Sequence, residues 1–159
     1  MATSYGQTNA IKAAIIGLFT TEMQTGKLPS VLAVGPVAYP EAGVYPYIGV
    51  ELIHRKEEVI ANNNRASKCL WGINISVRST TLMQDAVALR DVIIDDGAGN
   101  GVEPLLRNVA RTRFSGLISK GEIKEVFMTN NLDANKTDTP TEFFSEAAIF
   151  FETLQVITA

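Results

Sequence analysis

The chain has 159 residues, of which 46% are hydrophobic and 19% charged, and its formal net charge is −3. This length suits one domain, and the composition excludes a disordered chain. The acidic balance gives no support to DNA or RNA as a specific partner, because phosphate neutralisation supplies most of the affinity of nucleic-acid binders. The low charge also favours a protein with buried subunit interfaces, although a compact monomer would show the same bias.

Cys69 is the one cysteine and His54 the one histidine. This count excludes an internal disulfide and a zinc site built from Cys and His. Residues 1–7 lack the basic and apolar segments of a secretory signal. The longest apolar run, residues 13–19, is shorter than the roughly 20 residues that span a bilayer. We therefore expect a soluble protein of a cytoplasm-like compartment, without a membrane partner.

The first half of the chain predicts one helix followed by strands. Ile11, Ile15, Leu18 and Phe19 lie at helical spacing within residues 8–23, with Thr8 as the expected amino-terminal cap. Residues 31–37 predict a short strand at a sheet edge, and residues 47–53 a longer one. The polar residues 54–68 indicate either a long hairpin excursion or a mobile loop. Residues 69–78 alternate clearly, with one face apolar: Trp71, Ile73, Ile75 and Val77.

The second half repeats the order of helix and strand. A helix is expected from Thr80 or Thr81 to about Asp95, with a short helix over residues 102–112 after it. Residues 121–128 predict a strand with Ile123, Val126 and Phe127 as apolar anchors. A polar loop over 130–140 and a closing strand over 146–157 follow. The order favours a single α+β domain over residues 1–159, with two main helices packed on a mainly antiparallel, mixed sheet.

No segment carries a convincing signature of chemistry. The run of alternating glycines at 97–101 is followed by Val102 and Glu103 instead of the lysine and hydroxyl of a phosphate-binding loop, which indicates a helix stop. Asp95 and Asp96 do not fit the spacing of a calcium loop. His54 and Cys69 lack the companions of a general base or a reactive thiol. We therefore expect no catalytic residues, no metal and no cofactor.

A basic group and a polar run are the remaining candidates. Arg107 and Arg111 would share one face of a helix, with Arg113 nearby. They form either a solvated surface or a dock for an acidic surface of another subunit. The predicted subunit or partner contacts are these arginines and the centre of the polar run: Asn62, Asn63, Asn64, Arg65, Arg107, Arg111 and Arg113.

Four stretches together give the chain a family resemblance. They are the helix over 9–16, the strand over 46–50, the strand over 71–77 that leads into the helix over 85–91, and the closing strand over 147–152. In order, length and pattern the chain resembles the tail terminator, or tail-completion, proteins of long-tailed bacteriophages.

The resemblance implies a virion structural protein that is assembled in the host cytoplasm. Such proteins form a ring, usually a hexamer, on the last layer of the tail tube, stop its growth and present a docking surface for the head connector. Implied partners are further copies of the chain, the tail tube protein and a head completion or connector protein. The segment 95–101 and the helix at Pro104 do not fit this pattern, so another neck or tail-tube subunit remains an alternative. A small ligand-binding or enzymatic domain, using Glu51, His54, Asp95 and Asp96, is a further one.

Overall fold

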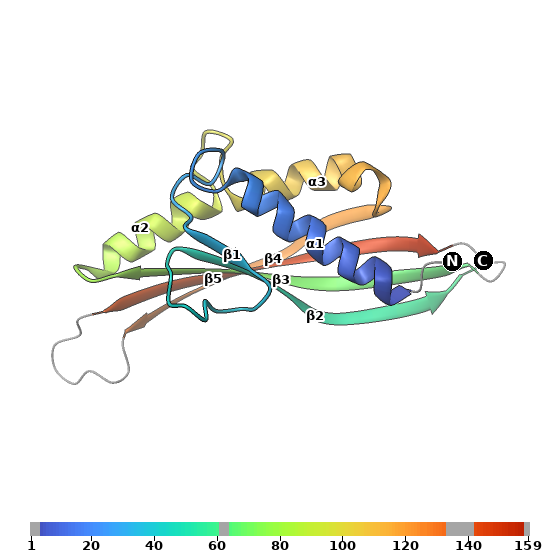
Figure 1. Ribbon diagram of the computed structural model, residues 1–159, viewed down its shortest axis with the longest axis horizontal. Helices are drawn as coiled ribbons and strands as arrows, with labels where there is room; N and C mark the ends of the chain where they lie inside the picture. The colour runs from blue at the N-terminus through green and yellow to red at the C-terminus, as the bar shows by residue number, and fades with distance from the viewer. Residues whose placement is uncertain (1–3, 61–63, 133–141, 158–159) are drawn as a thin grey trace.

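The computed structural model describes residues 4–60, 64–132 and 142–157, which form three helices and a five-stranded mixed sheet. The strands lie in the order β1-β2-β3-β5-β4, with β1 parallel to β2 and all other neighbours antiparallel. All three helices lie over the same face of the sheet (Figure 1). The predicted α+β fold is confirmed, and α3 is a third helix beyond the two main ones expected. The elements are α1 (Ser4–Glu22), β1 (Ala33–Gly35), β2 (Tyr47–Val59), β3 (Arg65–Ser79), α2 (Met83–Ile94), α3 (Val102–Gly116), β4 (Lys120–Leu132) and β5 (Phe143–Ile157).

Helix α1 packs one stripe of side chains onto the sheet. Ile11, Ile15 and Phe19 are buried at the predicted spacing. The helix begins at Ser4, so Thr8 lies inside it and is not its cap. Thr8 is buried in the first half of the helix.

Gly17 lies on the exposed side of α1, and a Cβ built on it meets nothing within 4 Å. Glycine in a helix loses more backbone freedom on folding than alanine does. We therefore expect Gly17→Ala to raise the free energy of unfolding by about 0.5–1 kcal/mol. Urea denaturation followed by circular dichroism checks this, and a loss of stability would contradict the open position of Gly17.

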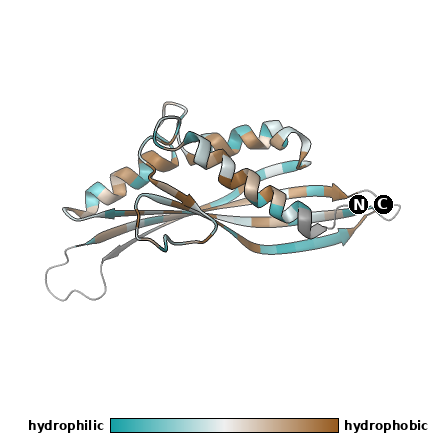
Figure 2. Cartoon of the chain, in the orientation of Figure 1, coloured by the Kyte–Doolittle hydropathy of each residue, from teal (hydrophilic) through white to brown (hydrophobic). Residues whose placement is uncertain are grey.

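The core lies between the helices and the apolar face of β3 and β5. Trp71, Ile73, Ile75 and Val77 are all fully buried, as their alternation predicted. Trp71 donates a hydrogen bond from Nε1 to Oγ1 of Thr153 on β5 at 2.9 Å. Figure 2 shows apolar residues gathered beneath the helices and polar residues along the far half of β2.

The polar run 54–68 is a long hairpin, and the alternative of a mobile loop is wrong for the described residues. Strand β2 continues to Val59 and β3 already begins at Arg65, with paired residues from His54↔Leu70 to Val59↔Arg65. Backbone pairing with β3, which is itself paired to β5, holds this segment even though its side chains are polar. A register shift between Leu52 and His54 lets Ile53 bulge out of the pattern.

Helix α2 begins at Met83 without a side-chain cap, so the capping role predicted for Thr80 or Thr81 is wrong. Thr81 instead donates a hydrogen bond to Oδ2 of Asp85 at 2.8 Å. In α3 the right-handed backbone ends before Arg113, as the expected helix over 102–112 implies. Arg113, Phe114 and Ser115 have positive φ values of 58°, 48° and 56°, which make a left-handed turn leading towards β4.

Strand β4 is longer than expected and runs to Leu132, so the predicted loop over 130–140 begins too early. The rest of that loop lies outside the described residues. A register shift between Ile123 and Glu125 reverses the alternation within β4. Val126 pairs with buried Ile149, whereas Phe127 pairs with Ala148 and is 55% exposed. Phe127 is therefore not the core anchor that its apolar character suggested.

The face of the sheet away from the helices is partly covered by the loop between β1 and β2 (Figure 1). This loop crosses β2 at Gly49, where an added Cβ would stand 2.1 Å from the carbonyl oxygen of Val37. The hydroxyl of Tyr47 donates a hydrogen bond to that same carbonyl at 2.7 Å. The ring of Tyr45 meets the ring of Phe144 edge-on, which ties the end of the loop to β5.

Candidate partner-binding site

The basic group on α3 borders a hollow that the α2–α3 loop shapes. Asp96 organises this loop, because its Oδ1 accepts hydrogen bonds from the backbone of Ala98 and Asn100 at 2.7 and 3.0 Å. The side-chain hydrogen bond from Asn100, followed by these two backbone bonds, lowers the pKa of the Asp96 carboxyl. Gly101 has φ 124°, and an added Cβ would meet the carbonyl oxygen of Ile94 at 2.6 Å. Asp96 therefore stabilises the loop that follows α2, and the glycine run at 97–101 lies in this loop, after the end of the helix.

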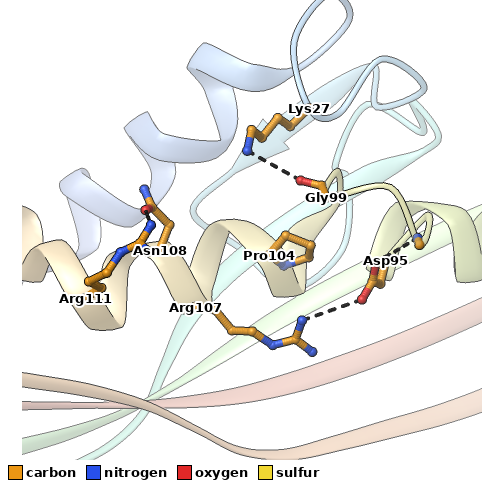
Figure 3. Close-up of a pocket in the computed structure, with 8 residues that line it drawn as sticks. Lys27, Asp95, Gly99, Pro104, Arg107, Asn108 and Arg111 are labelled. Atoms are coloured by element: carbon orange, nitrogen blue, oxygen red, sulfur yellow. Dashed lines mark hydrogen bonds and ion pairs between the residues drawn. The ribbon is translucent and has the colours of Figure 1, made fainter.

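The hollow is open, has a volume of about 550 Å³ and is lined by the loop after α1, the α2–α3 loop and α3 (Figure 3). Arg107 pairs with Asp95 at 3.7 Å and with Glu103 one turn earlier on α3. Lys27 reaches across from the loop after α1 and donates to the carbonyl oxygen of Gly99 at 3.4 Å. The lining residues are Lys27, Asp95, Gly97, Gly99, Pro104, Arg107, Asn108 and Arg111.

The electrostatics of this hollow suit an acidic surface better than a small ligand. Arg111 donates to the side-chain oxygen of Asn108 at 2.7 Å and has no acidic partner within 4 Å in the described part of the chain. The Arg107 side chain is 60% exposed, so its two ion pairs are weak and easily exchanged. The cations thus remain accessible to carboxylates from outside.

The predicted contact residues do not form one cluster. Arg107 and Arg111 line the hollow together, as their spacing predicted, whereas Arg113 does not line it. Asn64 and Arg65 lie at the tip of the β2–β3 hairpin, where Asn64 accepts the backbone hydrogen bond of Ile60 at 2.8 Å. Asn62 and Asn63 lie outside the described residues. The hairpin reaches one end of the sheet, while α3 lies over its middle (Figure 1).

The residues considered for chemistry are dispersed. Glu51 and His54 lie on β2, while Asp95 and Asp96 follow α2. Burial raises the pKa of the Cys69 thiol, which favours the unreactive protonated form. Across residues 4–60, 64–132 and 142–157, no three side chains of His, Cys, Asp or Glu are grouped so that they could hold a metal ion.

The exposed apolar residues of the edge strand β4 were not predicted from the sequence. Phe127 and Met128 on β4 are 55% and 48% exposed. The sequence carried one signal of this exposure. Phe127 and Met128 are adjacent apolar residues, and neighbours in a strand point to opposite faces of the sheet, so they cannot both face the core. The contribution of Lys27 to the hollow was also not predicted, because Lys27 and Gly99 are far apart in the sequence.

None of the helices within the described residues is long and apolar enough to cross a membrane. No protein-family model and no curated protein matches the sequence. Among the solved structures, the chain is similar to a chain in the virion of a native gene transfer agent particle. That similarity covers 94% of this chain and 90% of the other, at 12% identity and a TM-score of 0.27. A likeness of this degree carries no argument about function.

Proposed function

We propose that this chain is a virion structural protein, a tail terminator that assembles into a ring on the end of the tail tube. The ring would stop tube elongation and provide the docking surface for the head connector. The partners would be further copies of the chain, in a hexamer, the tail tube protein and a head completion or connector protein. The proposal includes no enzymatic activity, no specific binding of nucleic acid and no membrane contact.

The observation that carries the proposal is the edge strand β4, which is unprotected over the part that follows its charged first half. It is 13 residues long and, within the described residues, pairs only with β5. Its first half is blunted by charge, with Glu122 and Lys124 paired at 3.2 Å. The following part instead exposes Phe127 and Met128. Long edges with exposed apolar residues promote association, and proteins that stay monomeric usually block them with charge or proline.

The opposite edge of the sheet, at β1 and β2, offers a different surface. Strand β1 covers only three residues of β2, Tyr47 to Gly49, and leaves the rest of that edge unpaired within the described part. Leu52, Ile53 and Val59 are exposed along this portion, Val59 at 74%. Two unlike edges on one subunit favour a head-to-tail contact, and such contacts close into rings when the rotation between subunits permits.

The basic hollow and the β2–β3 hairpin then remain for the other partners. The hollow lies on the helix side of the sheet, and the hairpin lies at one end of it (Figure 1). Lys27, Arg107 and Arg111 present cations that fit an acidic surface of the tube or connector. We assign Asn62 to Arg65 and the α3 arginines to these contacts.

We expect Met128→Lys to abolish ring assembly. Lysine on an edge strand opposes pairing because its charge would have to be buried in the new contact. Sedimentation velocity over a wide concentration range, with and without tail tubes, measures the effect. The wild-type chain should form a discrete ring alone or on tube ends, and the variant should remain monomeric with an unchanged circular dichroism spectrum.

Leu82→Lys is the matched control, because Leu82 is similarly exposed, at 51%, but precedes α2 and lies off the sheet edge. It should assemble as the wild type does. A wild-type chain that stays monomeric at high concentration, even with tubes present, would refute the ring. Growth into open-ended cylinders would identify a tail-tube subunit instead.

A further inference from the structure

A second, smaller cavity lies on the sheet face opposite the helices. It has a volume of about 250 Å³ and is lined by Tyr39 from the β1–β2 loop and by residues of β3, β4 and β5. The strand register places its side chains in two rows. Ser76, Glu146 and Thr129 form one row across the three strands, and Asn74, Ala148 and Phe127 form the next.

Two small residues leave room for this cavity. Ala148 occupies the central position of its row, between Asn74 and Phe127, and its methyl group fills little of the space. Gly49 allows the β1–β2 loop to lie against β2, since any Cβ there would overlap the loop backbone. The loop thereby brings Tyr39 over β5, where its hydroxyl lies 3.5 Å from Oε2 of Glu146.

The lining is rich in hydrogen-bond acceptors and contains no basic side chain. Ser76 is only 2% exposed, and its hydroxyl has no hydrogen-bond partner among the described residues. Buried polar groups are almost always paired, so this hydroxyl indicates a missing partner. Asn74 uses its amide nitrogen to donate to Glu51 at 3.1 Å, which leaves its carbonyl oxygen available.

Glu146 is the one carboxylate in the cavity, and within the described residues no Lys or Arg lies within 4 Å of it. Burial raises the pKa of its carboxyl, which the Tyr39 hydrogen bond opposes. In turn the charge of Glu146, followed by burial, raises the pKa of Tyr39. Arg78, two residues beyond Ser76 on β3, is engaged elsewhere, since it lies over the ring of Tyr45 at 5.3 Å and pairs with Glu142 at 3.7 Å.

Two aromatic side chains accompany the carboxylate. Tyr39 is 59% exposed and Phe127 is 55% exposed, so both line the part of the cavity that opens to solvent. Aromatic faces attract organic cations, and the attraction grows as the cation loses water. A carboxylate, an unpaired hydroxyl and two rings thus offer complementary contacts to the same kind of group.

We propose that this cavity binds an organic cation, a guanidinium or alkylammonium head group. The cavity is smaller than the roughly 300–1,000 Å³ of sites for drug-sized ligands, which fits the end of one basic side chain or a small amine. The cavity is complete within one chain, and its Phe127 also lies on the β4 edge proposed for ring assembly.

The test uses N-acetyl-arginine amide and N-acetyl-lysine amide as probes, with neutral N-acetyl-citrulline amide as the control. Amide chemical shifts of the full-length chain are followed by NMR during each titration. We expect saturable shifts at Thr129, Ala147 and Ala148 with at least one cationic probe and none with citrulline. Glu146→Gln should weaken binding about tenfold or more, as expected for loss of a charged hydrogen-bond partner.

Two further variants separate binding from folding. Glu122→Gln changes a carboxylate on the same face of the sheet, paired in register with Glu152 and outside the cavity, and should bind as the wild type does. Phe127→Ala removes one ring from an exposed position and should weaken binding while keeping the fold. Absence of saturable shifts at millimolar cation, or equal shifts with Glu146→Gln, would overturn the proposal.

Sedimentation in the presence of the arginine probe distinguishes the source of the cation. If the probe and Glu146→Gln both weaken self-association, the natural occupant is a basic side chain of a second copy. If the probe binds and self-association is unchanged, the occupant is a free organic cation. Either result supports the cavity as a cation site.

Discussion

Trp71→Ala is expected to lower the free energy of unfolding by about 3–5 kcal/mol, the usual cost of removing a large buried aromatic side chain. Trp71 is fully buried at the centre of β3, in register with Phe151 of β5 and Leu52 of β2. Domains are stable by only about 5–15 kcal/mol, so the variant would lose a large share. Urea denaturation measures the loss directly, and thermal unfolding should show a midpoint lower by roughly 6–20 °C.

Trp71→Phe separates the hydrogen bond from the packing. It keeps an aromatic ring but removes the donor that bonds to buried Thr153. An unsatisfied buried hydroxyl costs about 1–3 kcal/mol. Adding Thr153→Val should recover part of that loss, because both polar partners are then gone. A Trp71→Ala variant within about 1 kcal/mol of the wild type would contradict the central place of Trp71 in the core.

The sequence predicts this core well because its signal is local. The alternation from Trp71 to Val77 gives the inward face of β3, and the spacing of Ile11, Ile15 and Phe19 gives the buried stripe of α1. Each pattern follows from the periodicity of one element and needs no knowledge of its neighbours. The α+β class follows from the order of such elements.

The far half of the β2–β3 hairpin could not be predicted in the same way. Residues 54–59 are almost all polar, and polar segments without alternation are typical of loops. They are strands because β3 is paired on both sides, with β2 and with β5. Ion pairs on the hairpin, such as Lys56 with Glu58 at 3.2 Å, accompany this pairing but are too exposed to determine it.

The two candidate sites differ in the same way, because one follows from local spacing and the other from contacts between distant segments. Arg107 and Arg111 lie together because residues four apart share a helix face, and the sequence alone predicts that. Lys27 joins them only through the packing of α1 beside α3. The cavity at Glu146 depends on the register of three strands, and the bulge in β4 turns Phe127 towards it. A shift of one residue would turn these side chains to the other face.

Gly49→Ala is expected to displace the β1–β2 loop and to lower the free energy of unfolding by about 1–3 kcal/mol, as overpacking does. The added Cβ would lie 2.1 Å from the carbonyl oxygen of Val37 and 2.8 Å from that of Ala38. Both atoms belong to the backbone, so no side-chain rotation relieves the overlap. The loop must lift, which breaks the bond from Tyr47 to Val37 and moves Tyr39 away from Glu146.

Gly72→Ala is the matched control on the same face of the sheet. Its added Cβ would meet Cδ1 of Ile53 at 3.0 Å and Cγ of Glu51 at 3.3 Å, both on flexible side chains. These can move by a few tenths of an ångström, so we expect a change below about 1 kcal/mol. Urea denaturation compares the two variants, and titration with the arginine probe should show weaker binding for Gly49→Ala alone. Equal stability of both variants would mean that the loop does not lie against β2, because only backbone contact makes Gly49 irreplaceable.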